Sequence, residues 1–143
     1  MSKGNVFEND FLKLVFNATP IANIADNAAT SPLTSLYVSL HTADPGEAGN
    51  QTTSEISYTG YARVAVARSP AGFTVINNSV SPAAEISFGA MTAGTGGTAT
   101  HAAIGTDPSG TGKILYKGAL SPTIAVANGV TPKMTTASAI TED

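Results

Sequence analysis

The sequence predicts an all-β fold: an antiparallel β-sandwich, with a jelly roll as the favoured topology and a short N-terminal helix or arm. Residues 34–41 alternate strictly between apolar and polar side chains, which is typical of a half-buried strand. We count about eight or nine short strands, separated by polar turns at the roughly 8–12-residue spacing of sandwiches and barrels. An immunoglobulin-like sandwich is the second choice, although the chain has neither the Cys nor the Trp typical of that fold.

A helix is expected over residues 5–17. Asn5 can cap it, and Glu8 stands three residues later, close to the spacing of a capping box. One face of this helix would carry Phe7, Phe11, Leu14 and Val15. The helix would then either pack on the edge of the β-domain or form an arm that docks on a neighbouring subunit.

The segment after the helix has few bulky side chains and ends at Pro32, so it is expected to be an extended connector. A chain of 143 residues forms one domain by default. We therefore divide the chain into residues 1–32, the N-terminal helix or arm with its connector, and residues 33–143, the β-sandwich domain.

The first strand covers residues 34–41. Its core face would carry Leu36, Val38 and Leu40. Its opposite face would carry Tyr37, Ser39 and His41. Asp44-Pro45-Gly46 then predicts a turn, because Pro presets φ and Gly accepts positive φ.

A second strand, residues 60–68, would direct Val64 and Val66 to the core, together with Ala62, and Arg63 outward. A turn is expected at Asn77-Asn78. The other expected strands cover residues 72–76, 79–81, 84–88, 98–105, 113–120 and 123–126, and residues 133–141 close the domain.

Composition narrows the class of partner. Charged residues make up only 12% of the chain, about half the usual share, so part of the surface is expected to be covered by a partner. The net charge is −3 and the basic residues are scattered, which argues against nucleic acid and anionic membranes as partners. Cysteine is absent, and the N-terminus does not read as a signal peptide. We expect synthesis in a cytoplasm.

A metal site is weighed and not predicted. His41, Asp44 and Glu47 lie close in sequence, and His101 could join them in space. Asp44 precedes Pro45 in a turn, so this spacing is weak. Two unrelated histidines, solvated or hydrogen-bonded at strand ends, are expected instead.

An enzyme is not expected either. Residues 105–113 resemble a phosphate loop at a glance, but Ile114 follows Lys113 where that motif needs Ser or Thr. No serine lies in a Gly-x-Ser-x-Gly pattern. The acidic residues lie mostly in loops, in the helix or at the terminus, so no catalytic residue and no cofactor is predicted.

Arg63 and Arg68 are the most informative charges, because they lie on or beside a strand among small residues. Either they belong to a solvated outer face, or one of them pairs with a carboxylate across a subunit interface.

Several segments carry a resemblance to a family of small tailed-phage virion proteins. They are residues 36–49, 58–66, 103–120 and 140–143, in the same order and within most of residues 33–143. Members of that family resemble capsid decoration (cement) proteins, among them that of a Bordetella-type short-tailed phage, and some carry tail-fibre labels. The resemblance implies a sandwich that self-associates, with a homodimer favoured and a trimer as alternative. It also implies binding to the major capsid protein on the capsid exterior of the virion, without enzyme activity.

The expected interface residues are Phe7, Phe11, Tyr58, Tyr61 and Arg63. Deleting residues 1–17 should then weaken capsid binding. The alternative is a tail-fibre or receptor-binding module, in which Tyr37, Tyr61 and Tyr116 would stack on sugars.

Overall fold

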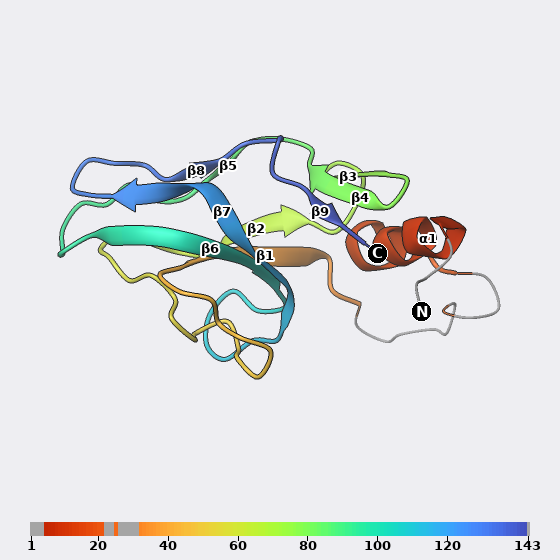
Figure 1. Ribbon diagram of the computed structural model, residues 1–143, viewed down its shortest axis with the longest axis horizontal. Helices are drawn as coiled ribbons and strands as arrows, with labels where there is room; N and C mark the ends of the chain where they lie inside the picture. Colours follow the sequence, from red (N-terminus) through yellow and green to blue (C-terminus); the bar gives the residue numbers. More distant parts are fainter. Residues whose placement is uncertain (1–4, 22–24, 26–31, 143) are drawn as a thin grey trace. The chain divides into compact units, whose positions relative to one another are not determined.

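The computed structural model describes residues 5–21, 25 and 32–142 (Figure 1). Within them, one helix, α1 (Asn5–Asn17), precedes nine strands. The strands are β1 (Ser35–His41), β2 (Val64–Ala67), β3 (Phe73–Ile76), β4 (Ser79–Pro82), β5 (Ile86–Ser87), β6 (Gly97–Gly105), β7 (Ile114–Val126), β8 (Lys133–Met134) and β9 (Ile140–Thr141). The pairs β1–β6, β3–β4, β4–β9 and β6–β7 are antiparallel. The prediction of an all-β antiparallel fold with one short helix is confirmed, while the jelly-roll topology stays a prediction.

Two compact units make up the chain. The helix unit consists of Met1–Ser35, Val66–Glu85 and Met134–Asp143. The sheet unit consists of Leu36–Ala65 and Ile86–Lys133. Each unit is therefore assembled from segments that lie far apart in the sequence.

In the helix unit, α1 packs against the hairpin of β3 and β4, and the sheet order is β3-β4-β9 (Figure 1). The ring of Phe16 meets that of Phe73 edge-on, with centroids 4.9 Å apart, and both side chains are buried. Such a pair contributes about 0.5–1.5 kcal/mol beyond the area it buries. The N-terminal helix thus packs on its own chain, which is the first of the two arrangements expected.

The buried face of α1 is not the expected one. Leu12 and Phe16 are fully buried, and Glu8 is nearly so; these residues are spaced four apart and share one side of the helix. Phe7 is 40% exposed and Phe11 is half-buried. The predicted stripe lies to one side of the true one because it was built on Phe7 and Phe11 and left out Leu12 and Phe16.

The C-terminus of α1 is capped by Arg68. Its Nε and Nη2 donate to the carbonyl oxygens of Val15 and Leu14, both at 2.6 Å. These carbonyls have no partner within the helix, and a cation is favourable at this end. Ala18 follows with a positive φ of 53°. Arg68 therefore serves the helix of its own chain, and among the described residues its partners are backbone carbonyls and no carboxylate.

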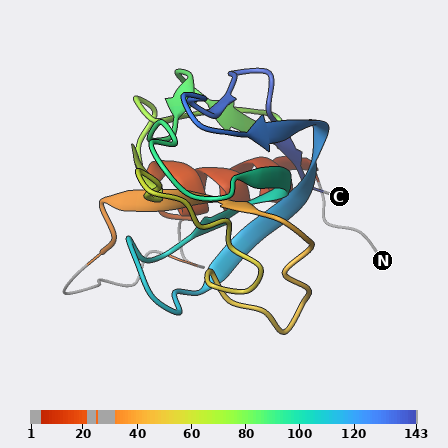
Figure 2. The ribbon, with the colours of Figure 1, turned by 90° about the vertical axis from the view of Figure 1, so that its left-hand side faces the viewer.

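In the sheet unit, the four-stranded order is β2-β1-β6-β7. The two longest strands, β6 and β7, run side by side (Figures 1 and 2). The segments predicted at residues 113–120 and 123–126 form one strand, β7, and its register with β6 shifts between Ala99 and His101. The alternation predicted for β1 is confirmed for its core face, since Leu36, Val38 and Leu40 are buried.

The opposite face of β1 is also covered, which corrects the prediction that it points away from the core. Ser39 and His41 are fully buried. The loop after β1 folds back along the strand: Ile56 N donates to Leu40 O at 2.9 Å, and Thr42 N donates to Ser54 O at 2.8 Å. The alternating pattern marks one buried face, but it does not say whether a loop covers the other.

Candidate functional site

Three of the expected interface residues, Tyr58, Tyr61 and Arg63, meet in the sheet unit. Arg63 binds Glu55 with two parallel hydrogen bonds, Nε to Oε1 and Nη2 to Oε2, each 2.8 Å long. Its remaining donors reach the carbonyl oxygens of Asp107, at 3.0 Å, and Gly110, at 2.7 Å. The guanidinium thereby joins the loop before β2 to the loop between β6 and β7.

Arg63 was expected to face outward, and that prediction is wrong. Its side chain is only 3% exposed and that of Glu55 is 15% exposed. Strand β2 begins at Val64, so the alternation predicted from Gly60 onward does not extend to Arg63. The hydrogen bonds to Glu55 raise the pKa of Arg63. The carboxylate partner belongs to the same chain, where a neighbouring subunit was expected to supply it.

The two tyrosines complete this cluster. Tyr61 accepts a hydrogen bond from Leu40 N at 3.1 Å and donates one to Glu55 Oε1 at 2.9 Å. Burial raises the pKa of Tyr61, and also that of Tyr58. Tyr58 donates to Gly89 O at 2.8 Å, and its ring centroid lies 5.3 Å from that of Tyr61. Both hydroxyls are therefore used within the subunit.

His41 and His101 are opposite each other in the β1–β6 register. Nδ1–H of His41 donates to Thr53 O at 2.8 Å, and Nε2 accepts from the hydroxyl of Ser39 at 2.9 Å. A carbonyl oxygen only accepts, so Nδ1 carries a proton, and it is in the neutral ring that Nε2 accepts from the Ser39 hydroxyl. Burial lowers the pKa of His41.

The acidic residues of the loop after β1 bind a lysine. Lys117 lies 3.0 Å from Asp44 and 3.2 Å from Glu47. The hydrogen bond from Gly46 N lowers the pKa of Asp44, and the bond to Asp44 raises that of Lys117. Among the described residues, no group of three or more His, Cys, Asp or Glu side chains is arranged to hold a metal ion.

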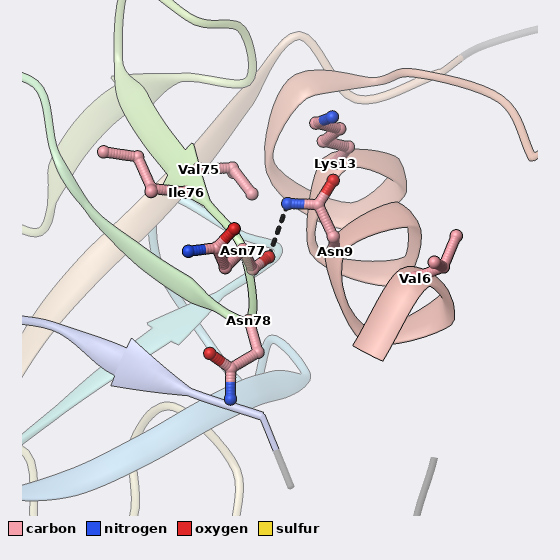
Figure 3. A pocket seen from close by; sticks show the side chains of 7 residues that line it. All are labelled: Val6, Asn9, Lys13, Val75, Ile76, Asn77 and Asn78. Atoms are coloured by element: carbon pink, nitrogen blue, oxygen red, sulfur yellow. Dashed lines mark hydrogen bonds between the residues drawn. The ribbon is translucent and has the colours of Figure 1, made fainter. Parts of the chain in front are cut away.

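The helix unit carries an open groove of about 610 Å³ between α1 and the β3–β4 hairpin (Figure 3). We call it the helix–hairpin groove. It is lined by Val6, Asn9, Lys13, Val75, Ile76, Asn77 and Asn78. Two of these are among the most exposed large apolar side chains described: Val6 is 77% exposed and Ile76 is 64% exposed. An exposed apolar surface with a polar rim is typical of a protein-binding site.

Hydrogen bonds hold the walls of this groove. Asn9 Nδ2 donates to Asn77 O across it (Figure 3). Asn77 takes a positive φ of 53° in the hairpin turn. This is the turn that was predicted at Asn77-Asn78. Asn78 Nδ2 donates to Glu142 O at 2.9 Å, and Glu142 N donates to Asn78 O at 2.9 Å. Hydrogen bonds thus link α1, the hairpin turn and Glu142 around the groove.

The groove and the expected interface overlap only partly. Phe7 lies next to Val6 in the helix, and its ring centroid is 6.3 Å from that of Phe11. Sequence reasoning missed Val6, Lys13 and Ile76 as surface residues. The exposure of Ile76 could have been predicted from the sequence, because Ile76 occupies an outward position of a strand in which Phe73 faces inward. The interface role of Phe7, Phe11, Tyr58, Tyr61 and Arg63 stays a prediction.

The fold is mostly β, and the helix–hairpin groove is lined by three aliphatic and four polar or charged residues. Among the described residues, no helix has the length and apolar character that a membrane span requires. Over residues 4–141 the sequence matches a family described as podophage GP4 fiber I protein gp80. The chain belongs to this family of podophage virion proteins. No curated protein matches it significantly.

Proposed function

We propose that the chain is a capsid decoration (cement) protein, which binds the outside of the phage head and bridges subunits of the major capsid protein. Membership of a podophage virion family supports a structural role in the particle. The observation that carries the proposal is the exposed apolar surface at the helix–hairpin groove. In this proposal the protein has no catalytic activity.

Binding would stabilise the shell by burial of that surface. Covering one exposed aliphatic side chain such as Val6 or Ile76 contributes about 1.5–3 kcal/mol, before the cost of association is subtracted. Self-association of the protein, as a dimer or a trimer, would let one particle-bound oligomer contact several capsid subunits, and the resulting avidity would offset that cost.

The second candidate is a fibre or receptor-binding tail module, which the word fiber in the family description favours. Such a module was expected to stack sugars on three tyrosines, but the contacts of Tyr61 argue against that role for it. Its hydroxyl is bonded on both sides and its ring packs on Phe88 with centroids 6.3 Å apart. One of the three tyrosines expected to stack on sugars is thus half-buried and bonded within its own unit.

Replacing Ile76 by Asp tests the docking surface. Ile76 is 64% exposed, so the change should leave the free energy of unfolding within about 0.5 kcal/mol of wild type. Rebinding to heads that lack the protein should fall about tenfold or more, because a charge would be buried in an apolar contact.

Val130→Asp is the matched control, since Val130 is also exposed, at 37%, and lies outside the groove. It should rebind to heads like wild type. Equal rebinding of Ile76→Asp and wild type would contradict docking through the groove.

A further inference from the structure

We propose that the helix–hairpin groove binds an extended peptide segment of its virion partner in which a carboxylate follows an aliphatic side chain by two or three residues. This inference rests on the proposed function only in taking the groove as the docking surface. It adds the chemistry of the segment that is bound.

The length of the groove suits an extended chain. Val6, Asn9 and Lys13 lie on one side of α1, at helix positions i, i+3 and i+7. Seven residues at about 1.5 Å each separate Val6 from Lys13 by about 10 Å along the helix axis. That distance is spanned by about three residues of an extended strand, at roughly 3.3 Å each.

The lining changes in character along that length. The start of α1 offers Val6, which is 77% exposed, and an aliphatic side chain of the partner can be buried there. The far end offers Lys13, the one charged residue among the described residues that line the groove. Figure 3 shows Val6 and Lys13 at opposite ends of the labelled helix residues, with Asn9 between them.

Charge complementarity selects the group at the far end. Within the described part of the chain, no ion pair of the Lys13 ammonium is found, whereas Lys117 is paired with Asp44 and Glu47. A carboxylate of the partner can therefore pair with Lys13 without displacing an existing partner. The pair would lie in a partly enclosed groove, where screening is weaker than on an open surface.

The amides in the middle suit a peptide backbone. Asn78 and Asn77 line the groove beside Asn9. Because Nδ2 of Asn9 and of Asn78 already donate to Asn77 O and Glu142 O, a peptide lying over the Asn9–Asn77 bridge would donate its N–H groups to the side-chain amide oxygens. Backbone bonding is indifferent to sequence, so selectivity would come from the apolar and the basic ends.

Two synthetic peptides test this inference on the full-length protein. Both are extended, blocked at their ends and carry valine at the first position; the fourth position is aspartate in one and lysine in the other. We expect amide chemical-shift changes at the groove residues, and a dissociation constant about three- to fivefold lower for the aspartate peptide.

Lys13→Glu should abolish or reverse that preference, while Lys113→Glu, an equal charge change at an exposed residue outside the groove, should keep it. Equal binding of the two peptides, binding by neither, or shifts away from the groove would each overturn the inference. A low copy number in virions would contradict the decoration role but leave the peptide preference intact, so the two failures are distinguishable.

Discussion

The pair formed by Glu55 and Arg63 joins two loops of the sheet unit through one buried side chain. Arg63 uses Nε, Nη1 and Nη2 in hydrogen bonds to Glu55 and to two loop carbonyls. A buried ion pair is a weak source of stability compared with apolar packing, but breaking it leaves an uncompensated charge. Its main effect here is to fix two loops in one arrangement.

Arg63→Met should therefore destabilise the protein by about 3–5 kcal/mol, since the Glu55 carboxylate is left without its partner. The double variant Arg63→Met with Glu55→Gln should be less destabilised than the single one, because no unpaired charge remains. Urea unfolding of the two variants and the wild type measures both effects. A loss below about 1 kcal/mol in the single variant, as for an exposed pair, would contradict this account.

His41 gives stability a pH dependence. Burial lowers its pKa below the ordinary value of 6.5. Above about pH 6.5 the imidazole is neutral in both the folded and the unfolded chain, and its full contribution to stability is present. As the pH falls below that value, the unfolded chain takes up the proton first, so the free energy of unfolding decreases until the folded-state pKa is passed.

We therefore expect the free energy of unfolding to fall between about pH 7 and about pH 5, by at most about 1.4 kcal/mol per pH unit from this group. His41→Gln should show a smaller decrease over the same range, because the titrating group is gone. Urea unfolding at a series of pH values measures the two slopes. Identical slopes for the variant and the wild type would show that His41 does not cause the pH dependence of stability.

At the scale of elements, the C-terminal end of α1 carries avoidable strain. Ala18 takes a φ of 53°, and a left-handed residue directly after a helix is a position that favours glycine. Ala18→Gly should raise stability by about 0.5–1 kcal/mol. Thermal unfolding would show a higher midpoint.

Ala67→Gly is the control for this prediction. Ala67 is exposed in β2, and Gly within a strand should lower stability by about 0.5–1 kcal/mol. A lower midpoint for Ala18→Gly as well would show that backbone strain at Ala18 is not what limits the helix end.

The elements themselves could be predicted because their signals are local. The described part of the helix, Asn5–Asn17, ends where its pattern indicated, and the strict alternation of residues 34–41 became β1. The burial of His41 and Arg63 could not be predicted, because it depends on loops that return from elsewhere in the chain. The groove was missed for the same reason: Asn9 and Asn77 meet across it, and no local pattern relates residues that far apart in sequence.

For the whole molecule, the packing of α1 changes how the docking surface should be tested. Removing residues 1–17 would take Leu12 and Phe16 out of the core of the helix unit, at a cost of several kcal/mol. Lost binding would then report unfolding as much as a lost contact. Substitutions of exposed residues, such as Ile76→Asp, separate the two effects.

The number of copies of the chain in purified virions tests the central claim most directly. Quantitative mass spectrometry against the major capsid protein provides that number. A decoration protein that bridges capsid subunits should be present at a ratio near one per capsid subunit, or at a simple fraction of it. A few copies per particle would contradict the decoration role and assign the chain to the tail.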